Sequence, residues 1–182
     1  EVKILIQSVK PGRNRLLVEL LYSSGLRVSE AVKLKVENLQ WDDTLARVQG
    51  GKGNKDRLVV LSKEWLKEVK KYLQRKRVPS PFVFSKRNGK PITSDTVQRV
   101  LRKAVQKTGM ARHVTPHSLR HSFATHLLED GENIRKIQEL LGHSNLSTTQ
   151  IYTKVSTAEL KKVQSPLDRL KGKNTQPPIA KP

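Results

Sequence analysis

The sequence predicts a mainly α-helical domain with one small antiparallel β-sheet, an α+β fold. Most segments place apolar residues at helical spacing, three or four positions apart. Only two β-like runs stand out, at residues 45–49 and 57–61, and the Gly- and Asn-rich turn between them indicates a hairpin. Glycines and prolines separate the helical segments, as expected for a chain of short helices joined by tight turns.

The helical segments follow from their apolar stripes and end signals. Pro11 and Gly12 break the first helix from the second, whose leucines lie on one side and which Gly25 ends. Thr115 followed by Pro116 is a strong helix start, a cap and then a proline in the first turn. We expect helices over residues 1–10, 13–24, 27–34, 63–77, from 93 or 94 past 105, 115–130 and 134–141, and a short polar helix around Tyr152. Residues 78–85 are predicted to form a loop and a short strand.

Charge is the strongest signal in the composition. The 182 residues hold 36 Lys and Arg against 16 Asp and Glu, a formal net charge of +20. Such a field attracts polyanions, and nucleic acid is the leading partner. An anionic membrane surface is the alternative, but the basic residues are spread along the chain rather than gathered on one amphipathic helix. The absence of cysteine excludes disulfides, thiol catalysis and cysteine zinc sites.

The predicted helix at 115–130 carries a cluster of histidine and arginine. His117 and Arg120 lie three residues apart, on neighbouring rows, beside an apolar stripe that can face the core. A cation next to an imidazole suits a phosphate, although a plain surface pair explains the spacing as well. His117 and His121 have zinc-like spacing, but without a third ligand nearby we expect no metal. His126 falls close to the apolar stripe and is expected to be a packed structural histidine.

The turn of the predicted hairpin, GGKGNKDR at 50–57, is rich in glycine and lysine. It is not a phosphate-binding P-loop, because the spacing differs and the turn joins two strands rather than a strand and a helix. A mobile loop with Lys52 and Lys55 near its tip remains, which either inserts a lysine into a DNA groove or is a solvated turn.

Five motifs occur in a fixed order along the chain: GLRVSE, GKGNKDR, TPHSLRHSFATHLLEDG, LGH and STTQIYTKVS. Together they resemble the tyrosine recombinase (phage integrase) family, most closely its Xer branch, over roughly residues 13–156. The resemblance implies a catalytic domain of that family's fold. It also implies DNA cleavage and rejoining through a covalent bond between the enzyme and DNA.

The resemblance assigns the reacting groups. Tyr152 would be the nucleophile that forms a 3′-phosphotyrosyl bond, and Lys52 the general acid that protonates the departing 5′-oxygen. His117 would act as general base or phosphate donor, and His143 would also hydrogen-bond the phosphate.

The resemblance also assigns the phosphate clamp. Arg27 and Arg120 would hold the non-bridging oxygens, because a planar guanidinium meets phosphate with two hydrogen bonds and stays charged. Glu30 would play a supporting role, although it could be an ordinary helix carboxylate. With these cations around one phosphate, no cofactor and no metal ion is expected, and the reaction should proceed in chelator.

Domain limits and partners follow in the same way. We expect a catalytic domain at 1–164, with the N-terminal core-binding domain of the family missing from this sequence, and a flexible or partner-docking tail at 165–182. Apolar residues after Tyr152 suit docking on a neighbouring subunit or packing on their own domain equally: Ala158, Leu160, Val163 and Leu167. The expected partners are double-stranded DNA and further copies of the chain in a four-subunit Holliday-junction assembly, in the cytoplasm and without a membrane.

Several hypotheses about the biological role are compatible with the sequence. Xer-like chromosome dimer resolution is the one the resemblance favours. Integration or excision of a mobile element uses the same chemistry. Relaxation of DNA in the manner of a type IB topoisomerase is a further alternative, and a basic DNA-binding protein without catalysis is another.

Overall fold

The structure is a computed structural model that describes residues 1–49, 56–111, 113–142 and 157–171. Its first half contains α1 (Val2–Ser8), α2 (Arg13–Ser24), α3 (Val28–Lys33), the 3-10 turn η1 (Val36–Asn38), β1 (Leu39–Gln40), β2 (Leu45–Val48), β3 (Arg57–Val60) and α4 (Lys63–Gln74). Its second half contains α5 (Ser94–Thr108), α6 (Pro116–Glu129), α7 (Ile134–Leu141), α8 (Thr157–Lys161) and α9 (Pro166–Lys171). The predicted α+β class is confirmed.

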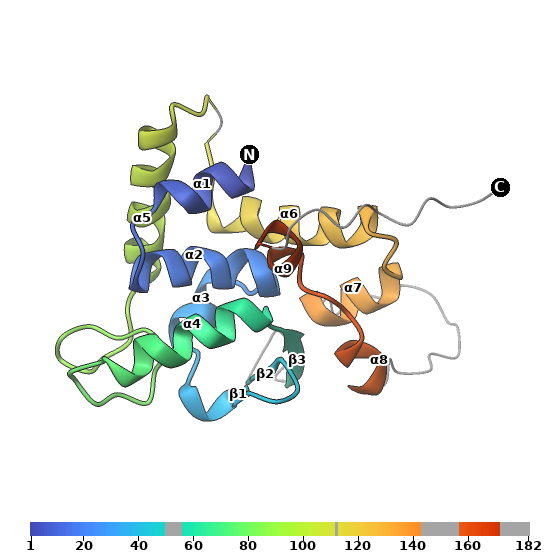
Figure 1. Ribbon diagram of the computed structural model, residues 1–182, viewed down its shortest axis with the longest axis horizontal. Helices are drawn as coiled ribbons and strands as arrows, with labels where there is room; N and C mark the ends of the chain where they lie inside the picture. Colours follow the sequence, from blue (N-terminus) through green and yellow to red (C-terminus); the bar gives the residue numbers. More distant parts are fainter. Residues whose placement is uncertain (50–55, 112, 143–156, 172–182) are drawn as a thin grey trace.

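Helix α2 is the centre of the fold (Figure 1), with α1, α3, α4, α5, α6 and α9 packed around it. The leucines that the sequence placed on one side of this helix are buried, and the burial extends beyond them. Every residue from Leu16 to Ser24 is buried, because neighbouring helices cover the helix on all sides. Even the charged Glu19 is buried, with 2% of its surface exposed, and its carboxylate forms an ion pair with Lys171 of α9 at 2.7 Å.

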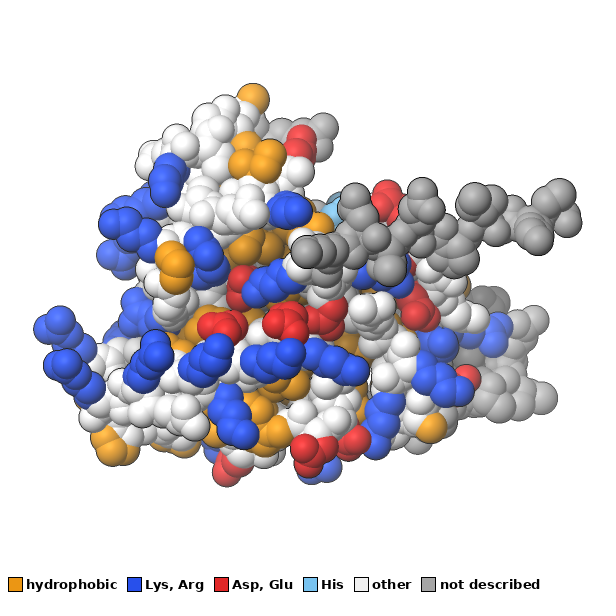
Figure 2. All heavy atoms as spheres, in the orientation of Figure 1, with side chains coloured by type: hydrophobic (Ala, Val, Ile, Leu, Met, Phe, Trp, Pro, Cys, Tyr) orange, Lys and Arg blue, Asp and Glu red, His pale blue; other side chains and the backbone are white. Residues whose placement is uncertain are grey.

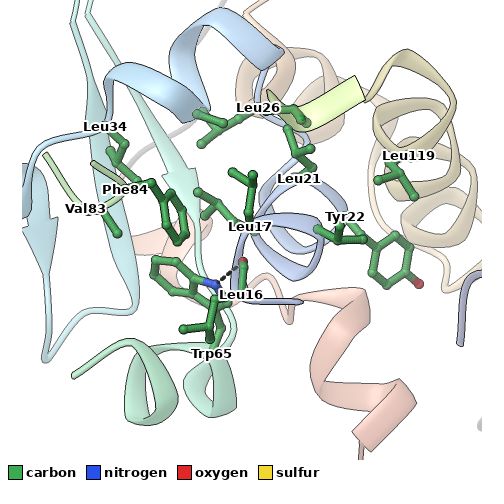
Figure 3. Close-up of a cluster of buried hydrophobic side chains, with 14 of the residues drawn as sticks. Leu16, Leu17, Leu21, Tyr22, Leu26, Leu34, Trp65, Val83, Phe84 and Leu119 are labelled. Carbon is green, nitrogen blue, oxygen red and sulfur yellow. Dashed lines mark hydrogen bonds between the residues drawn. The ribbon is translucent and has the colours of Figure 1, made fainter. Parts of the chain in front are cut away.

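The core joins α2 to α4 and to the strands (Figure 3). The indole of Trp65, fully buried in α4, donates from Nε1 to the carbonyl of Leu16 at 2.7 Å. Phe84, from the loop between α4 and α5, packs in the same cluster. This hydrogen bond satisfies the one polar atom of the largest buried side chain, so the contact fixes α4 against α2 without an unpaired group.

The sheet has three antiparallel strands in the order β1-β2-β3. The predicted hairpin is β2 paired with β3, in a register that sets Leu45 opposite Val60 and Val48 opposite Arg57. The sequence did not predict β1, which is two residues long. The expected short strand at 78–85 is reduced to isolated bridges, Lys35 with Phe82 and Ser85 with Pro91.

The helix ends follow their predicted signals. Thr115 caps α6 by accepting from the backbone N–H of Ser118 at 3.1 Å, with Pro116 next in the chain. Gly25, Gly109 and Gly142 end α2, α5 and α7 in the left-handed conformation that glycine adopts at low cost.

The segment from Ser165 is not a loose tail as far as Lys171. The hydroxyl of Ser165 donates to the carbonyl of Ser23, and Leu167 is 1% exposed in the core. Asp168 accepts from the hydroxyl of Ser62 at 2.5 Å and so joins the N-terminus of α4 to α9. Leu160, Val163 and Leu167 are therefore buried against the rest of the described chain, and the packing continues past residue 164 as far as Lys171. Residues 172–182 lie outside the described part of the chain.

In the described parts of the chain, no helix combines the length and the apolar character required to span a bilayer.

Candidate active site

Arg27 stands directly before α3, where extended backbone turns into helix. Its backbone N–H donates to Glu30 Oε2 at 2.8 Å, and its Nη1 donates to Glu30 Oε1 at 3.0 Å. Its Nη2 donates to the carbonyl oxygen of Gly142 at 3.3 Å. These contacts hold the guanidinium in place, and because its side chain is 34% exposed, it remains accessible to a ligand.

Arg120 projects inward from α6 and is 8% exposed. Its Nη1 donates to the carbonyl of Gly25, at the end of α2, at 2.5 Å. Its Nη2 donates to the carbonyl of Leu141, at the end of α7, at 2.6 Å. Burial, followed by the neighbouring positive charges of Arg27 and Arg57, lowers the pKa of Arg120 to about 10. The group is therefore still protonated at neutral pH.

Arg27, directly before α3, and Arg120, in α6, meet at one place. Their anchors, the carbonyls of Gly142 and Leu141, belong to adjacent residues. The structure thus brings together two guanidiniums that the sequence placed 93 positions apart. Two such forks can hold two oxygens of one phosphate, which is the arrangement expected for stabilising an anionic transition state.

Glu30 is the carboxylate of this cluster and is 11% exposed. Besides Arg27, it accepts from Arg57 at both oxygens, Nη1 to Oε1 at 2.8 Å and Nη2 to Oε2 at 2.7 Å. Burial by itself would raise the pKa of the Glu30 carboxyl, but hydrogen bonds from Arg57 and Arg27 and the charge of Arg57 outweigh it and hold the pKa below its usual range. The expected supporting carboxylate is therefore an ionised partner of two arginines.

His117 lies in the first turn of α6 and is exposed, one helical turn from Arg120. With His121 it borders a groove between α1 and α6 that also has apolar walls. Within the residues described, no group of three or more His, Asp or Glu side chains is placed to hold a metal ion. His126 is packed, as predicted, with Nδ1 at 2.8 Å from the hydroxyl of Tyr22.

Lys52, His143 and Tyr152 lie outside the described residues. The described elements on either side of them are known. Lys52 belongs to the connection between β2 and β3, His143 follows Gly142 directly, and α8 begins at Thr157, after Tyr152. The assignment of these three side chains stays a prediction.

Sequence reasoning missed Arg57. It was treated only as the end of the hairpin turn, yet its side chain is 6% exposed and reaches across to α3. One signal was available. Arg57 and Val59 fall on the same face of a strand, and that face is apolar at Val59. A cation on the inner face of a strand needs a buried partner, which Glu30 provides.

Comparison with known proteins agrees with this arrangement. The family model described as the phage integrase family matches residues 1–159. Tyrosine recombinase XerA of Pyrococcus horikoshii is 48% identical over 164 residues, covering 88% of this chain and 57% of that protein. Tyrosine recombinase XerC of Leptospira interrogans is 46% identical over 154 residues, covering 83% of this chain and 49% of that protein. The chain thus spans about half the length of these curated relatives.

Solved structures give the same result. A crystal structure of XerA recombinase superimposes with a TM-score of 0.73 at 34% identity, covering 88% of this chain and 60% of that one. The structure of XerH site-specific recombinase bound to its difH substrate before cleavage superimposes with a TM-score of 0.70 at 27% identity, covering 80% and 46%. With its fold, its paired arginines and its family model in agreement, the chain belongs to the phage integrase family, that of the tyrosine recombinases.

Proposed function

We propose that this chain is the catalytic part of an Xer-like site-specific DNA recombinase. The observation that carries the proposal is the pair of guanidiniums of Arg27 and Arg120, anchored on adjacent carbonyls at the end of α7. Both are charged and donate to backbone carbonyls, and Glu30, the carboxylate that contacts Arg27, is also paired with Arg57. A phosphodiester is the ligand that such a pair fits best.

The proposed reaction has two balanced steps. The hydroxyl oxygen of Tyr152 attacks the scissile phosphorus, the bond from phosphorus to the 5′-oxygen breaks, and Lys52 gives that oxygen a proton. His117 takes the phenolic proton or donates to the phosphate, while Arg27 and Arg120 stabilise the charge on the non-bridging oxygens. In the second step a 5′-hydroxyl gives its proton to Lys52 and attacks the phosphotyrosine, a new phosphodiester forms, the bond from phosphorus to the phenolic oxygen breaks, and Tyr152 takes back the proton that it lost in the first step. The bond energy is conserved, so the reaction requires no ATP.

A basic groove supports DNA as the substrate. It lies between the end of α1, the start of α2 and the outer side of α5, with a volume of about 810 Å³. Among the described residues that line it, none is Asp or Glu, and seven are cations: Lys10, Arg13, Lys86, Arg87, Arg99, Lys103 and Lys107. On the face drawn in Figure 2, by contrast, Lys and Glu side chains lie side by side over α4, where they form ion pairs. An unpaired row of cations matches the spaced charges of a DNA backbone.

The assembly is proposed from the family resemblance. Recombination by this chemistry joins two duplexes, so we expect four copies of the full-length protein to act together through a Holliday junction. Among biological roles we propose chromosome dimer resolution, because the relatives at 45–48% identity carry the names XerA and XerC.

Covalent trapping tests the chemistry. The protein is mixed, in chelator, with a pool of nicked duplexes whose sequence is randomised on both sides of the nick, so that a short fragment escapes after cleavage. Denaturant-resistant protein–DNA product is then collected and sequenced, with Tyr152→Phe as control. Product that depends on Tyr152 and carries a common sequence supports a site-specific recombinase. DNA binding without product in either protein, also after the N-terminal domain of a relative has been fused, refutes the catalytic proposal.

The groove has its own test. If all seven cations neutralise phosphates, the logarithm of the binding constant should fall with the logarithm of salt concentration with a slope of about −6. Arg99→Gln combined with Lys103→Gln should make that slope shallower by about 2. Lys67→Gln combined with Lys71→Gln, which removes two cations already paired with glutamates of α4, is the matched control and should leave it unchanged.

A further inference from the structure

The guanidinium of Arg57 is nearly buried, with its side chain 6% exposed, and it donates from all three of its nitrogens. Two of its nitrogens donate to Glu30, and Nε donates to the carbonyl of Leu140 at 3.0 Å. We infer that Arg57 is a positioning residue for strand cleavage: through Glu30 it sets the pose of Arg27, and through α7 it ties that pose to the backbone that anchors Arg120. This inference rests on the recombinase function proposed above.

The first step of the argument is the shared carboxylate. Glu30 Oε1 accepts from Arg27 Nη1 at 3.0 Å and from Arg57 Nη1 at 2.8 Å. Arg27 also donates from its backbone N–H to Glu30 Oε2 at 2.8 Å, so without Arg57 the carboxylate would be held by a single residue at the start of its own helix. The two-pronged contact from Arg57 joins the same two oxygens to a rigid planar group on β3, which fixes the carboxylate from a second element and with it the pose of Arg27.

The second step is the end of α7. The last carbonyls of a helix have no partner within it. Here Leu140, Leu141 and Gly142 accept from Arg57, Arg120 and Arg27 respectively. Three guanidiniums are thereby set on three consecutive carbonyls. Removing the guanidinium of Arg57 takes one partner from Glu30 and one from Leu140, and among the described side chains it leaves Arg27 as the one that donates to that carboxylate.

The third step is charge. An ionised carboxylate beside a phosphate site would repel the phosphate, and Arg27 alone would be neutralised by it. The ion pair between Arg57 and Glu30 offsets that negative charge, so the charge of Arg27 remains available to the phosphate. Lysine cannot replace arginine here, because an ammonium is a point charge without a planar fork and cannot meet both carboxylate oxygens and the Leu140 carbonyl together.

A purely structural ion pair between β3 and α3 is the competing explanation, and kinetics separates the two. The variants are Arg57→Lys and Arg57→Gln. A surface arginine at the end of α4, changed as Arg75→Gln, is the charge-matched control outside the network. For each protein, the rate of phosphotyrosyl formation is measured in single turnover at saturating DNA, on the duplex selected by the trapping experiment. DNA affinity is measured separately on the same duplex, at a temperature where circular dichroism shows every variant folded.

The expected result is a rate at saturation that falls about 100-fold in Arg57→Lys, as for a catalytic group displaced by roughly 1 Å, while affinity changes less than about threefold. Arg75→Gln should react like wild type. The decisive readout is coupling. If Arg57 acts through Arg27, combining Arg57→Lys with Arg27→Lys should cost little more than the worse single change. A structural role predicts instead that the two losses multiply.

The outcomes are distinguishable. A wild-type rate in Arg57→Lys, or losses that multiply in the double variant, overturns the role of Arg57 while leaving the proposed function intact. Wild-type protein that forms no covalent product overturns the proposed function, and the inference falls with it. If Arg57→Gln does not fold, Arg57→Lys and the double variant still decide the question.

Discussion

Replacing Gly142 by alanine should be far more damaging than the same change at Gly109, although the two glycines share one backbone conformation. Both end a helix with φ near +65°. At Gly109 an added Cβ meets nothing within 4 Å. At Gly142 it would lie 2.7 Å from Cδ and 2.9 Å from Nε of Arg57, closer than such atoms approach in folded proteins.

The magnitudes can be separated. The left-handed conformation costs any residue with a side chain about 1 kcal/mol, and this cost is common to both variants. At Gly142 the collision adds about 1–3 kcal/mol of overpacking. If Arg57 moves aside to relieve the collision, its contacts with Glu30 loosen, and disturbing this buried ion pair adds to the loss of unfolding free energy. We expect a loss of about 1 kcal/mol in unfolding free energy for Gly109→Ala and of about 3 kcal/mol or more for Gly142→Ala.

Urea denaturation followed by circular dichroism measures both losses, with equal slopes as the check that the unfolded state is unchanged. Repeating both substitutions in an Arg57→Ala background tests whether Arg57 causes the difference. The side-chain atoms that an added Cβ would meet are then absent, so Gly142→Ala and Gly109→Ala should cost the same unfolding free energy. Equal losses for the two glycines in the original background would refute the reasoning, because Arg57 would then be free to move aside without cost.

Three further changes probe the remaining contacts. Glu30→Gln should cost about 3 kcal/mol of unfolding free energy at neutral pH, where it leaves a buried arginine without its counter-charge. Because the pKa of the Glu30 carboxyl is lower in the folded than in the unfolded state, this advantage of the wild type is fully present above the ordinary pKa near 4.5 and is lost as pH falls through the lowered, folded-state pKa. The difference in unfolding free energy, measured by urea titration at several pH values, should therefore shrink as the solution is acidified, and a difference that is independent of pH contradicts the ion pair. Asp168→Asn should cost about 1 kcal/mol in the same assay, since the carboxylate accepts from Ser62 and from backbone N–H groups in the first turn of α4, and no loss would mean that α9 does not hold that helix end. Trp65→Phe should cost about 1–2 kcal/mol by leaving the carbonyl of Leu16 unpaired, and a stability equal to wild type would show that water reaches it.

The parts of the fold that the sequence predicted correctly are those with local causes. Gly25 ends α2 and the Thr115-Pro116 pair starts α6, since the capping residue and the helix it limits are neighbours in the chain. Strand β1 was missed because two residues carry no periodicity and become a strand only by pairing with β2. The burial of α2 on all sides was missed for a similar reason, because its polar residues find partners in distant segments, as Glu19 does in Lys171.

The same difference between local signals and distant contacts applies to the site. The candidate residues were proposed from motifs in the sequence, and the structure places the guanidiniums of Arg27 and Arg120 on adjacent carbonyls, while their roles stay predictions. Arg57 stands in the same motif as Lys52 but was overlooked, because its importance lies in a contact with Glu30, 27 positions earlier in the chain. Type and spacing identify groups that react, whereas groups that hold them are recognised from packing.

The end of α7 explains how a protein can keep three guanidiniums together before any phosphate arrives. Like charges in a partly buried cluster repel each other, and after burial this repulsion from Arg27 and Arg57 is the next cause of the lowered pKa of Arg120. A second carboxylate would remove that repulsion but would also oppose an anionic ligand. Helix carbonyls are a better solution, since the C-terminus of a helix carries about half a negative charge, spread over groups that need donors in any case. One carboxylate and three carbonyls thus hold three cations with a net positive charge left over, and that excess is what a scissile phosphate would neutralise.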